Sequence, residues 1–234
     1  MLRSLKNRFG DTDEVAVLDM TSRGLEAVAD PSQALMQGRE DLWEGAAREG
    51  DRGRGLGSVV TVALAGRPLL VEIQALATDV LEQGMPRHTF AQGVDQRRVF
   101  IVLQVLQKFA RVHASGKDVT VSAVGGLDLR GDPSMDLALA VAVASSVHDR
   151  PAPRDVAVVG ELGLAGEVRP VAGVARRVAE ASRLGLKRII VPAAGWRDRD
   201  AEGLPIEVMP VRTLKAALRA VLSGGGGTGG GGGR

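Results

Sequence analysis

The chain has 234 residues, of which 44% are hydrophobic, and it carries 30 basic against 28 acidic residues. A chain of this length and apolar content can bury one large core, which excludes an intrinsically disordered protein. The lack of cysteine excludes disulfides, thiolate metal sites and a cysteine nucleophile. Charged residues stand within the first eight positions with no apolar run behind them, and no run of 18 apolar residues occurs anywhere. We therefore expect no Sec-type signal, no membrane span and a cytoplasmic location.

The first part of the chain is β-rich in its pattern. Residues 15–20 (VAVLDM) predict a strand, and residues 55–77 predict two strands joined as a hairpin around Gly66. At the other end, the glycine-rich run at 223–234 predicts a disordered tail. The folded domain is therefore expected to span residues 15–222.

An amphipathic helix is predicted over residues 96–113. Its apolar residues recur at helical spacing on one side, at Val99, Leu103, Leu106 and Ala110. Its polar residues recur on another side, at Arg97, Gln104, Lys108 and Arg111. The pattern indicates a helix with one buried side and one cationic side.

The second half of the chain mixes both kinds of element. After a strand predicted at 119–124, Asp132 and Pro133 predict an N-cap and the first position of a helix. That helix is apolar almost all round over 135–147, so we expect it to be buried on most sides. A strand, a helix, a strand and a helix are then predicted at 156–160, 173–184, 188–191 and 213–222. Because strands and helices do not alternate regularly, the predicted fold class is α+β.

Two zones of the sequence are locally basic. Between Arg87 and Lys117 six basic residues stand against one acidic residue, Asp95, and from 165 to 190 six stand against two. Such zones are typical of a phosphate-binding surface, although an ordinary solvated helix face gives the same pattern. Aromatic residues make up only 3% of the chain and tyrosine is absent, which favours contact with a duplex backbone over base stacking.

Five runs of the chain resemble the bacterial RadA (Sms) family of DNA-repair proteins. They are LKNRFG (Leu5 to Gly10), RPLLVEIQALA (Arg67 to Ala77), DLALAVAVASS (Asp136 to Ser146), GELGLAGEVRPVAGVARRVAEASRLG (Gly160 to Gly185) and IIVP (Ile189 to Pro192). The resemblance covers nearly the whole chain before the glycine-rich tail. It implies an α+β, Lon-protease-like proteolytic-domain fold of the ribosomal-protein-S5-like superfamily.

The resemblance also implies a longer parent protein with a zinc finger and a RecA-like ATPase, whose end would be residues 1–14. Zinc, ATP and Mg would belong to those parts. This sequence contains neither C-x-x-C nor G-x-x-x-x-G-K-[ST], so no cofactor is expected in it. Its three histidines show no metal-ligand spacing, so no metal site is predicted.

Active Lon enzymes use a serine and a lysine as nucleophile and base, and the resemblance locates both positions. Ser134 matches the nucleophile, whereas Ala175 occupies the position of the lysine. The two arginines at 176–177 cannot replace the base, because a guanidinium keeps its proton at physiological pH. Whether Lys117 or Lys187 serves as the base for Ser134 in place of the missing lysine stays open. We therefore predict that this chain is not an enzyme, while its parent would be a DNA-dependent ATPase.

The resemblance implies a DNA-binding domain that closes a homo-hexameric ring, within a motor of DNA repair and recombination that works with the RecA recombinase. It implies a nucleoid-associated protein that binds duplex or branched DNA without sequence preference. The predicted phosphate contacts are Arg87, Arg97, Lys108, Arg111, Arg169, Arg176 and Arg177. Lys6 and Arg8 are predicted to act in trans on the nucleotide of a neighbouring subunit in the parent. Two alternatives stay open: an active serine peptidase or peptide-binding domain, and a purely structural ring former.

Overall fold

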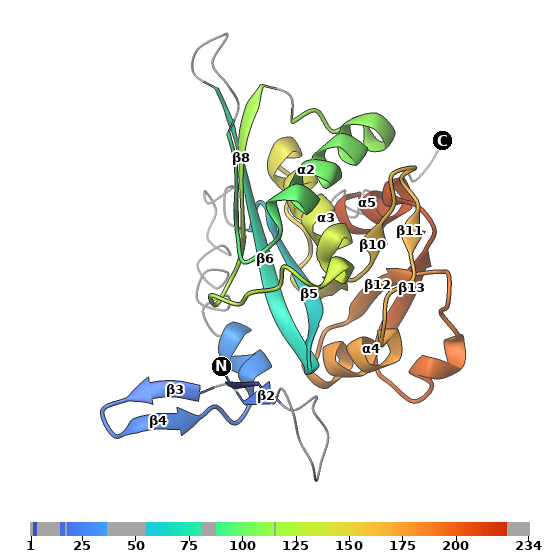
Figure 1. The fold of residues 1–234 in the computed structure, drawn as a ribbon. Coiled ribbons are helices and arrows are strands. Elements are labelled where there is room, and N and C mark those ends of the chain that lie inside the picture. The colour runs from blue at the N-terminus through green and yellow to red at the C-terminus, as the bar shows by residue number, and fades with distance from the viewer. Residues whose placement is uncertain are drawn as a thin grey trace, which may run out of the picture.

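The computed structural model describes residues 2–3, 15–16, 18–36, 55–80, 88–114 and 116–223. Within them, a seven-stranded mixed sheet forms the centre of the molecule, in the order β13-β12-β9-β5-β6-β8-β7 (Figure 1). Its strands are β5 (Ser58–Ala65), β6 (Arg67–Asp79), β7 (Thr89–Gln92), β8 (Lys117–Ala123), β9 (Val156–Val158), β12 (Arg188–Pro192) and β13 (Glu207–Val211). Together with the helices that cover it, this sheet confirms the predicted α+β class.

Strands β5 and β6 form the predicted hairpin. Gly66 lies in its turn with φ +86°, a backbone conformation that glycine adopts more easily than other residues. Beyond the hairpin, β6 pairs antiparallel with β8, and β7 pairs parallel with β8. On its other side, β5 pairs with β9 at one position only, Val60 opposite Ala157. The end of β5 therefore has no strand beside it on that side among the described residues.

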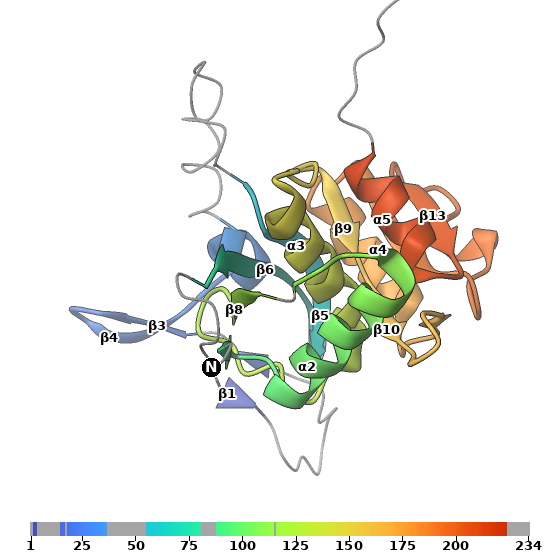
Figure 2. The same ribbon diagram turned by 90° about the horizontal axis from the view of Figure 1, so that it is seen from above.

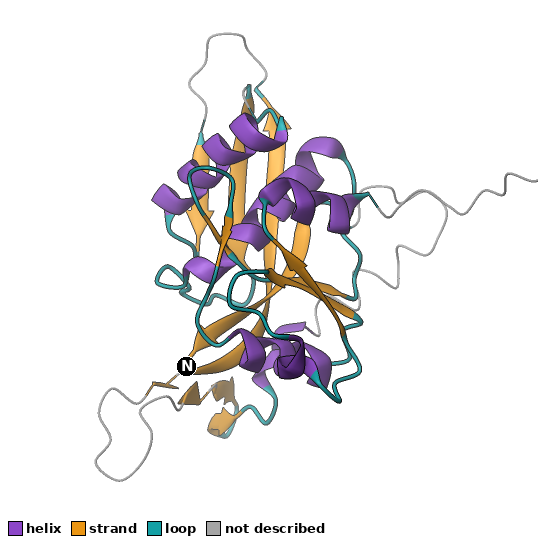
Figure 3. Cartoon of the chain, turned by 90° about the vertical axis from the view of Figure 1, so that its right-hand side faces the viewer, coloured by secondary structure: helices purple, strands orange, loops and turns teal. Residues whose placement is uncertain are grey.

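Helices cover both faces of the sheet, as Figure 2 and the side view in Figure 3 show. On one face lie α2 (Gln96–Val105), α3 (Asp136–His148) and α5 (Leu214–Leu222), and on the other lies α4 (Val174–Arg183). Alternate side chains of a strand point to opposite faces. Accordingly, Val59 and Ala63 pack in the core that includes α3, whereas Val60 and Val62 pack in the core that includes α4.

The predicted buried helix is confirmed as α3, in which every residue from Asp136 to Ser145 is buried. A short 3-10 turn, η3 (Pro133–Met135), leads into it. The predicted cap is also confirmed, because a side-chain oxygen of Asp132 accepts the backbone N–H of Ser134 at 3.0 Å.

Other elements differ from the prediction. The helix expected over 96–113 ends sooner: α2 continues as the π-helical turn η2 (Leu106–Ala110), and the chain leaves it at Arg111 with φ +56°. Strands β7 and β13 and the hairpin of β10 (Glu161–Leu162) and β11 (Val168–Arg169) were not predicted. Strands of two to five residues are too short to establish a period of two.

The N-terminal residues form small elements of their own. The predicted strand at 15–20 is divided between β2 (Val15–Ala16), which pairs with β1 (Leu2–Arg3), and β3 (Leu18–Thr21), which pairs with β4 (Gly24–Ala27). The β3–β4 hairpin projects from the body of the molecule (Figure 1), and residues 31–36 form a short helix. Most of 1–14, and the predicted tail after residue 223, lie outside the described residues. In the part that is described, no helix is long and apolar enough to cross a membrane.

Candidate functional site

The predicted nucleophile, Ser134, lies in η3 at the entry to α3 and is fully buried. Its hydroxyl oxygen accepts a hydrogen bond from Nη1 of Arg177 at 2.6 Å. A guanidinium has five donors and no acceptor, so it cannot take a proton from this hydroxyl. The group that contacts Ser134 therefore holds the hydroxyl in place and does not activate it.

Arg177 reaches Ser134 from α4, and its side chain is only 2% exposed. Its Nη2 donates to both carboxylate oxygens of Asp132, at 3.3 and 3.2 Å, and its Nη1 donates to Oδ2 at 3.2 Å. Its Nε donates to the carbonyl of Ala172 at 3.0 Å, and Nη1 also donates to the carbonyl of Val62. One side chain thus ties α4 and the loop before it to β5 and to the start of α3.

This geometry corrects the prediction that Arg177 contacts DNA. A buried guanidinium that is paired with Asp132 cannot reach a phosphate outside the protein. The resemblance to Lon puts Ala175 at the lysine position, and in the structure Ala175 is exposed. The residue that approaches Ser134 is thus two positions further along α4 than the motif alone indicates. Of the two lysines left open as bases, Lys117 pairs with Asp79 at 2.6 Å and Lys187 is exposed.

The electrostatics of the Arg177–Asp132 pair follow from its burial. Burial of Asp132 raises its pKa, but the hydrogen bonds of Ser134 and Leu64 and the charge of Arg177 hold the net pKa below its ordinary value. Burial lowers the pKa of Arg177, and Asp132 opposes that shift. Both groups remain charged near neutral pH, since arginine does not lose its proton in proteins.

The same pair occupies the edge of β5 that β9 leaves open. The carbonyl of Val62 accepts from Arg177, and the N–H of Leu64 donates to Asp132 at 2.9 Å. These two backbone groups are the kind with which an added peptide strand would pair. Arg177 and Asp132 therefore cover a position that an extended peptide would need beside Ser134.

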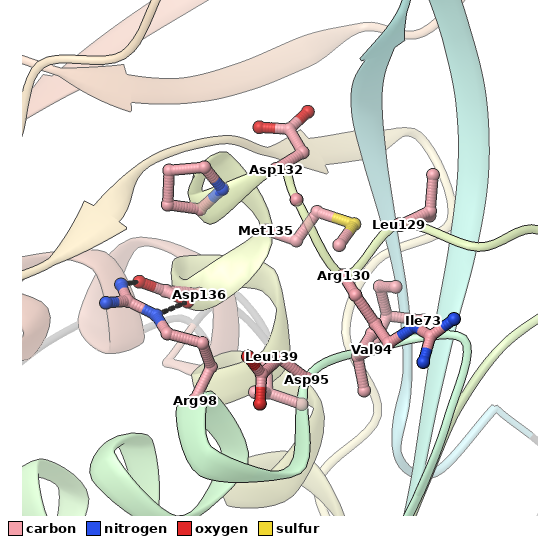
Figure 4. A pocket seen from close by; sticks show the side chains of 12 residues that line it. Ile73, Val94, Asp95, Arg98, Leu129, Arg130, Asp132, Met135, Asp136 and Leu139 are labelled. Carbon is pink, nitrogen blue, oxygen red and sulfur yellow. Dashed lines mark hydrogen bonds and ion pairs between the residues drawn. The ribbon is translucent and has the colours of Figure 1, made fainter.

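A groove of about 600 Å³ lies next to this pair. Its lining comes from the end of β5, the loop before α3, β10 and the loop before α4: Leu64, residues 128–133, Glu161, residues 170–172 and Arg177. It shares residues 129–133 with a second pocket of about 200 Å³, drawn in Figure 4.

The second pocket has an apolar floor and a charged rim. Ile73, Leu129 and Leu139 contribute to the floor, and Arg98 on the rim points toward Asp136 (Figure 4). Arg98 pairs with Asp136, whose second contact is the N–H of Leu162 at 3.1 Å. Burial raises the pKa of Asp136, and Arg98 opposes that shift. This ion pair fastens α2 to α3 and to β10.

The other predicted DNA contacts fall into two groups. Arg97, Lys108 and Arg111 are all exposed along α2, η2 and the residue that follows. Arg169 is exposed on β11 and pairs with Glu167 at 2.8 Å. These side chains lie on the side of the sheet that α2, α3 and α5 cover.

Arg176 belongs to the second group. It is exposed at the start of α4, on the opposite face of the sheet, and donates to the carbonyl of Gly66 at 3.3 Å. The structure therefore does not bring Arg176 together with the cations of α2. Arg87, Lys6 and Arg8 lie outside the described residues.

Sequence reasoning identified Asp132 only as a helix cap and missed its ion pair. A signal for the pair was present in α4, whose buried residues are Arg177, Val178, Ala181 and Ser182. Arg177 precedes Ala181 by four residues, which places both on the buried side of the helix.

Comparisons with known proteins agree with this fold. Residues 108–221 match the family model of the Lon protease (S16) C-terminal proteolytic domain. The chain is 41% identical to DNA repair protein RadA of Escherichia coli over 217 residues, which cover 93% of this chain and 44% of that protein. It is 38% identical to DNA repair protein RadA of Bacillus subtilis over 228 residues, which cover 96% of this chain and 46% of that protein.

A third relative, DNA repair protein RadA of Synechocystis, is 38% identical over 223 residues, covering 95% of this chain and 41% of that protein. The chain thus spans less than half the length of the curated relatives it matches. The family model covers the part of the chain from η2 to α5, which includes Ser134 and Arg177. These matches and the fold around Ser134 identify the chain as a Lon-like domain of the RadA family.

Proposed function

We propose that this chain is a DNA-binding, ring-forming domain of a DNA repair protein, and that it has no peptidase activity. The relatives are named DNA repair proteins, and the observation that carries the loss of proteolysis is the contact of Arg177 with Ser134 at 2.6 Å. A serine hydroxyl that faces a guanidinium receives no base from that contact. Its exposed cations then suit it to another task.

The DNA face would follow α2 and η2. Arg97 and Lys108 are eleven residues apart, which is about three helical turns, so they share one side of the helix at a separation of about 16 Å. Arg111 follows directly after η2 and is also exposed. Such a row of exposed cations can contact successive phosphates without reading bases.

Further cations converge at the end of this row. Phe109 packs against Gly166 in the β10–β11 turn, whose carbonyl accepts the N–H of Leu214 at the start of α5 at 2.9 Å. The turn therefore joins the end of η2 to the start of α5, which carries exposed Lys215 beside exposed Arg212. We assign the DNA face to Arg97, Lys108, Arg111, Arg169, Arg212 and Lys215.

A duplex-binding titration tests the face. Fluorescence anisotropy of a labelled duplex, measured between about 50 and 200 mM salt, should give affinity that falls steeply with salt. Replacing Arg97, Lys108 and Arg111 together with alanine should lower the salt slope by up to about 2.7, at about 0.9 per phosphate contact. The control Arg188→Ala removes a half-buried cation of β12 that pairs with Glu207, and it should leave the slope unchanged.

Arg176→Ala decides between the two faces of the sheet. If DNA lies along α2, this variant retains the wild-type slope. If Arg176→Ala lowers the slope and the triple variant does not, DNA lies along α4 and the assignment to α2 is wrong. If DNA binding does not depend on salt in any variant, the proposal that these cations contact phosphates is wrong.

Ring formation and motor function concern the whole protein. We propose a homo-hexameric ring, to be checked by native mass spectrometry, in a parent that uses ATP, Mg and Zn in its other domains and works with the RecA recombinase. Lys6 and Arg8 would act there on a neighbouring subunit's nucleotide, as cations that stabilise charge on the transferring phosphoryl group. Lys6→Ala or Arg8→Ala in the full-length protein should therefore abolish DNA-stimulated ATP hydrolysis while leaving the fold of this domain intact. Normal ATPase activity in both variants would refute that role.

A further inference from the structure

Helix α4 is held at two places along its length. Near its start, Arg177 forms an ion pair with Asp132 and donates a hydrogen bond to Ser134, as described above. Six residues later, which is about 9 Å along the helix axis, Arg183 forms an ion pair with Asp30, in a segment from the N-terminal part of the chain. We call that segment, residues 29–36, the strap.

An ion pair and a buried hydroxyl fasten the strap. Arg183 donates to both oxygens of Asp30, at 2.6 and 3.1 Å, and also to both oxygens of Glu180, each at 2.9 Å. The hydroxyl of Ser32, which is fully buried, donates to Glu180 at 2.7 Å. The same hydroxyl accepts the N–H of Leu70 at 3.1 Å. The strap thus bridges α4 and β6.

Leu70 explains why a hydroxyl is needed at that place. Strand β8 pairs with β6 only from Ile73 onward, so the outer edge of β6 at Leu70 is not covered by β8. A buried backbone N–H that has no partner destabilises the folded state, and Ser32 supplies the acceptor for Leu70. Near the end of the strap, Leu35 and Met36 pack against the two hydrophobic cores.

We propose that the strap is a releasable clamp on α4. When the strap is bound, it stabilises the contacts that Arg177 makes with Asp132 and Ser134 beside the groove. Among the described residues, the polar contacts of the strap to α4 are the ion pair of Asp30 with Arg183 and the hydrogen bond of Ser32 to Glu180. An element held by few polar bonds, with apolar side chains that are only partly buried as at Leu35 and Met36, opens more readily than the core of a domain. The loop before α4, residues 170–172, lines the groove, so a shift of the helix moves both that loop and Arg177.

The two ends of this mechanism can be observed separately by hydrogen exchange. The N–H of Leu70 reports on the strap, because Ser32 is its acceptor. The N–H groups of Leu64 and Ser134 report on the groove, because both donate to Asp132, which Arg177 holds. The interior of α3, for example Val141, reports on global unfolding.

The experiment compares Arg183→Ala and Ser32→Ala with the wild-type chain, using residue-resolved exchange. Each variant should accelerate exchange at Leu70 about tenfold and at Leu64 and Ser134 several-fold, without acceleration at Val141. The control Arg188→Ala breaks an exposed ion pair with Glu207 at 2.8 Å and should change none of the four.

Three outcomes would overturn the proposal. Unchanged exchange at Leu70 in both variants would mean that these contacts do not hold the strap. Faster exchange at Leu70 with unchanged exchange at Leu64 and Ser134 would mean that α4 does not transmit the release. Equal acceleration at all four amides would mean that the variants destabilise the whole domain and that the strap does not open as a separate unit.

Discussion

The buried pair of Arg177 and Asp132 makes a quantitative prediction for the variant Arg177→Met. Methionine has a similar length and is apolar, so it fills much of the space but leaves Asp132 without its cation. Removing one partner from a buried ion pair costs about 3–5 kcal/mol. Asp132 keeps two backbone donors, from Leu64 at 2.9 Å and Ser134 at 3.0 Å, and its side chain is 14% exposed. We therefore expect the lower end of that range, about 3 kcal/mol.

Urea denaturation, followed by circular dichroism, measures this loss directly. For a chain of this size, about 3 kcal/mol corresponds to a fall in the thermal midpoint of about 6–12 °C. Arg176→Ala is the matched control, because it removes an exposed arginine from the adjacent position and should change stability by less than about 0.5 kcal/mol. The double variant that adds Asp132→Asn removes both charges and should be more stable than the sum of the two single losses predicts, by at least about 1 kcal/mol.

If Arg177→Met unfolds within about 0.5 kcal/mol of the wild-type chain, the guanidinium does not stabilise the junction of α4, β5 and α3. If the two single losses add without coupling, Arg177 and Asp132 act independently in spite of their contact at 3.2 Å.

Three further predictions concern other groups. A serine-reactive fluorophosphonate probe should leave Ser134 unlabelled in the native chain, because Arg177 cannot act as a base. If the chain is labelled and the variant Ser134→Ala is not, the domain is an active serine peptidase. Arg183 lowers the pKa of Asp30 to about 2 from 3.8, so the stability that this pair contributes is present above about pH 4 and is lost as the pH falls toward 2. An NMR titration of the Asp30 carboxyl should show this, and Arg183→Ala should return the pKa toward 3.8; an unchanged pKa would mean that the pair does not persist in solution. Arg98→Ala should destabilise the chain by roughly 1–3 kcal/mol, because it leaves the 5% exposed carboxylate of Asp136 with a single backbone donor, and a thermal midpoint equal to that of the wild-type chain would contradict this.

The elements that could be predicted from sequence are those with a strong local cause. An apolar run of helical length can be satisfied only inside the protein, which is why α3 was predictable, and Asp132 with Pro133 fixed its start. Gly66 marked the β5–β6 turn for a similar reason, since its positive φ favours glycine. These features depend on neighbours in sequence and not on how distant segments meet.

The arrangement of the charged residues depends on topology, and sequence reasoning was weaker there. Arg97 and Arg176 both lie in basic zones, and nothing local indicates that α2 and α4 cover opposite faces of the sheet. Arginine adds a second difficulty, because its long side chain lets one residue face solvent and its neighbour reach the interior. Arg176 and Arg177 are adjacent, yet one is exposed and the other is 2% exposed. Both were predicted to contact DNA, and only the i, i+4 relation of Arg177 with Ala181 could have distinguished them.

The position of Arg177 suggests why a Lon-like fold can lose its lysine and remain stable. The edge of β5 needs a donor at Val62 and an acceptor at Leu64, and the start of α3 needs a partner for the Ser134 hydroxyl. A lysine ammonium has three donors and no planar fork, whereas the guanidinium has five and reaches Val62, Asp132 and Ser134 together. Replacing Arg177 with lysine should therefore lose part of these contacts even though the charge is kept. Arg177, two positions beyond the alanine that stands at the lysine position, therefore closes the edge of β5 and fixes the start of α3.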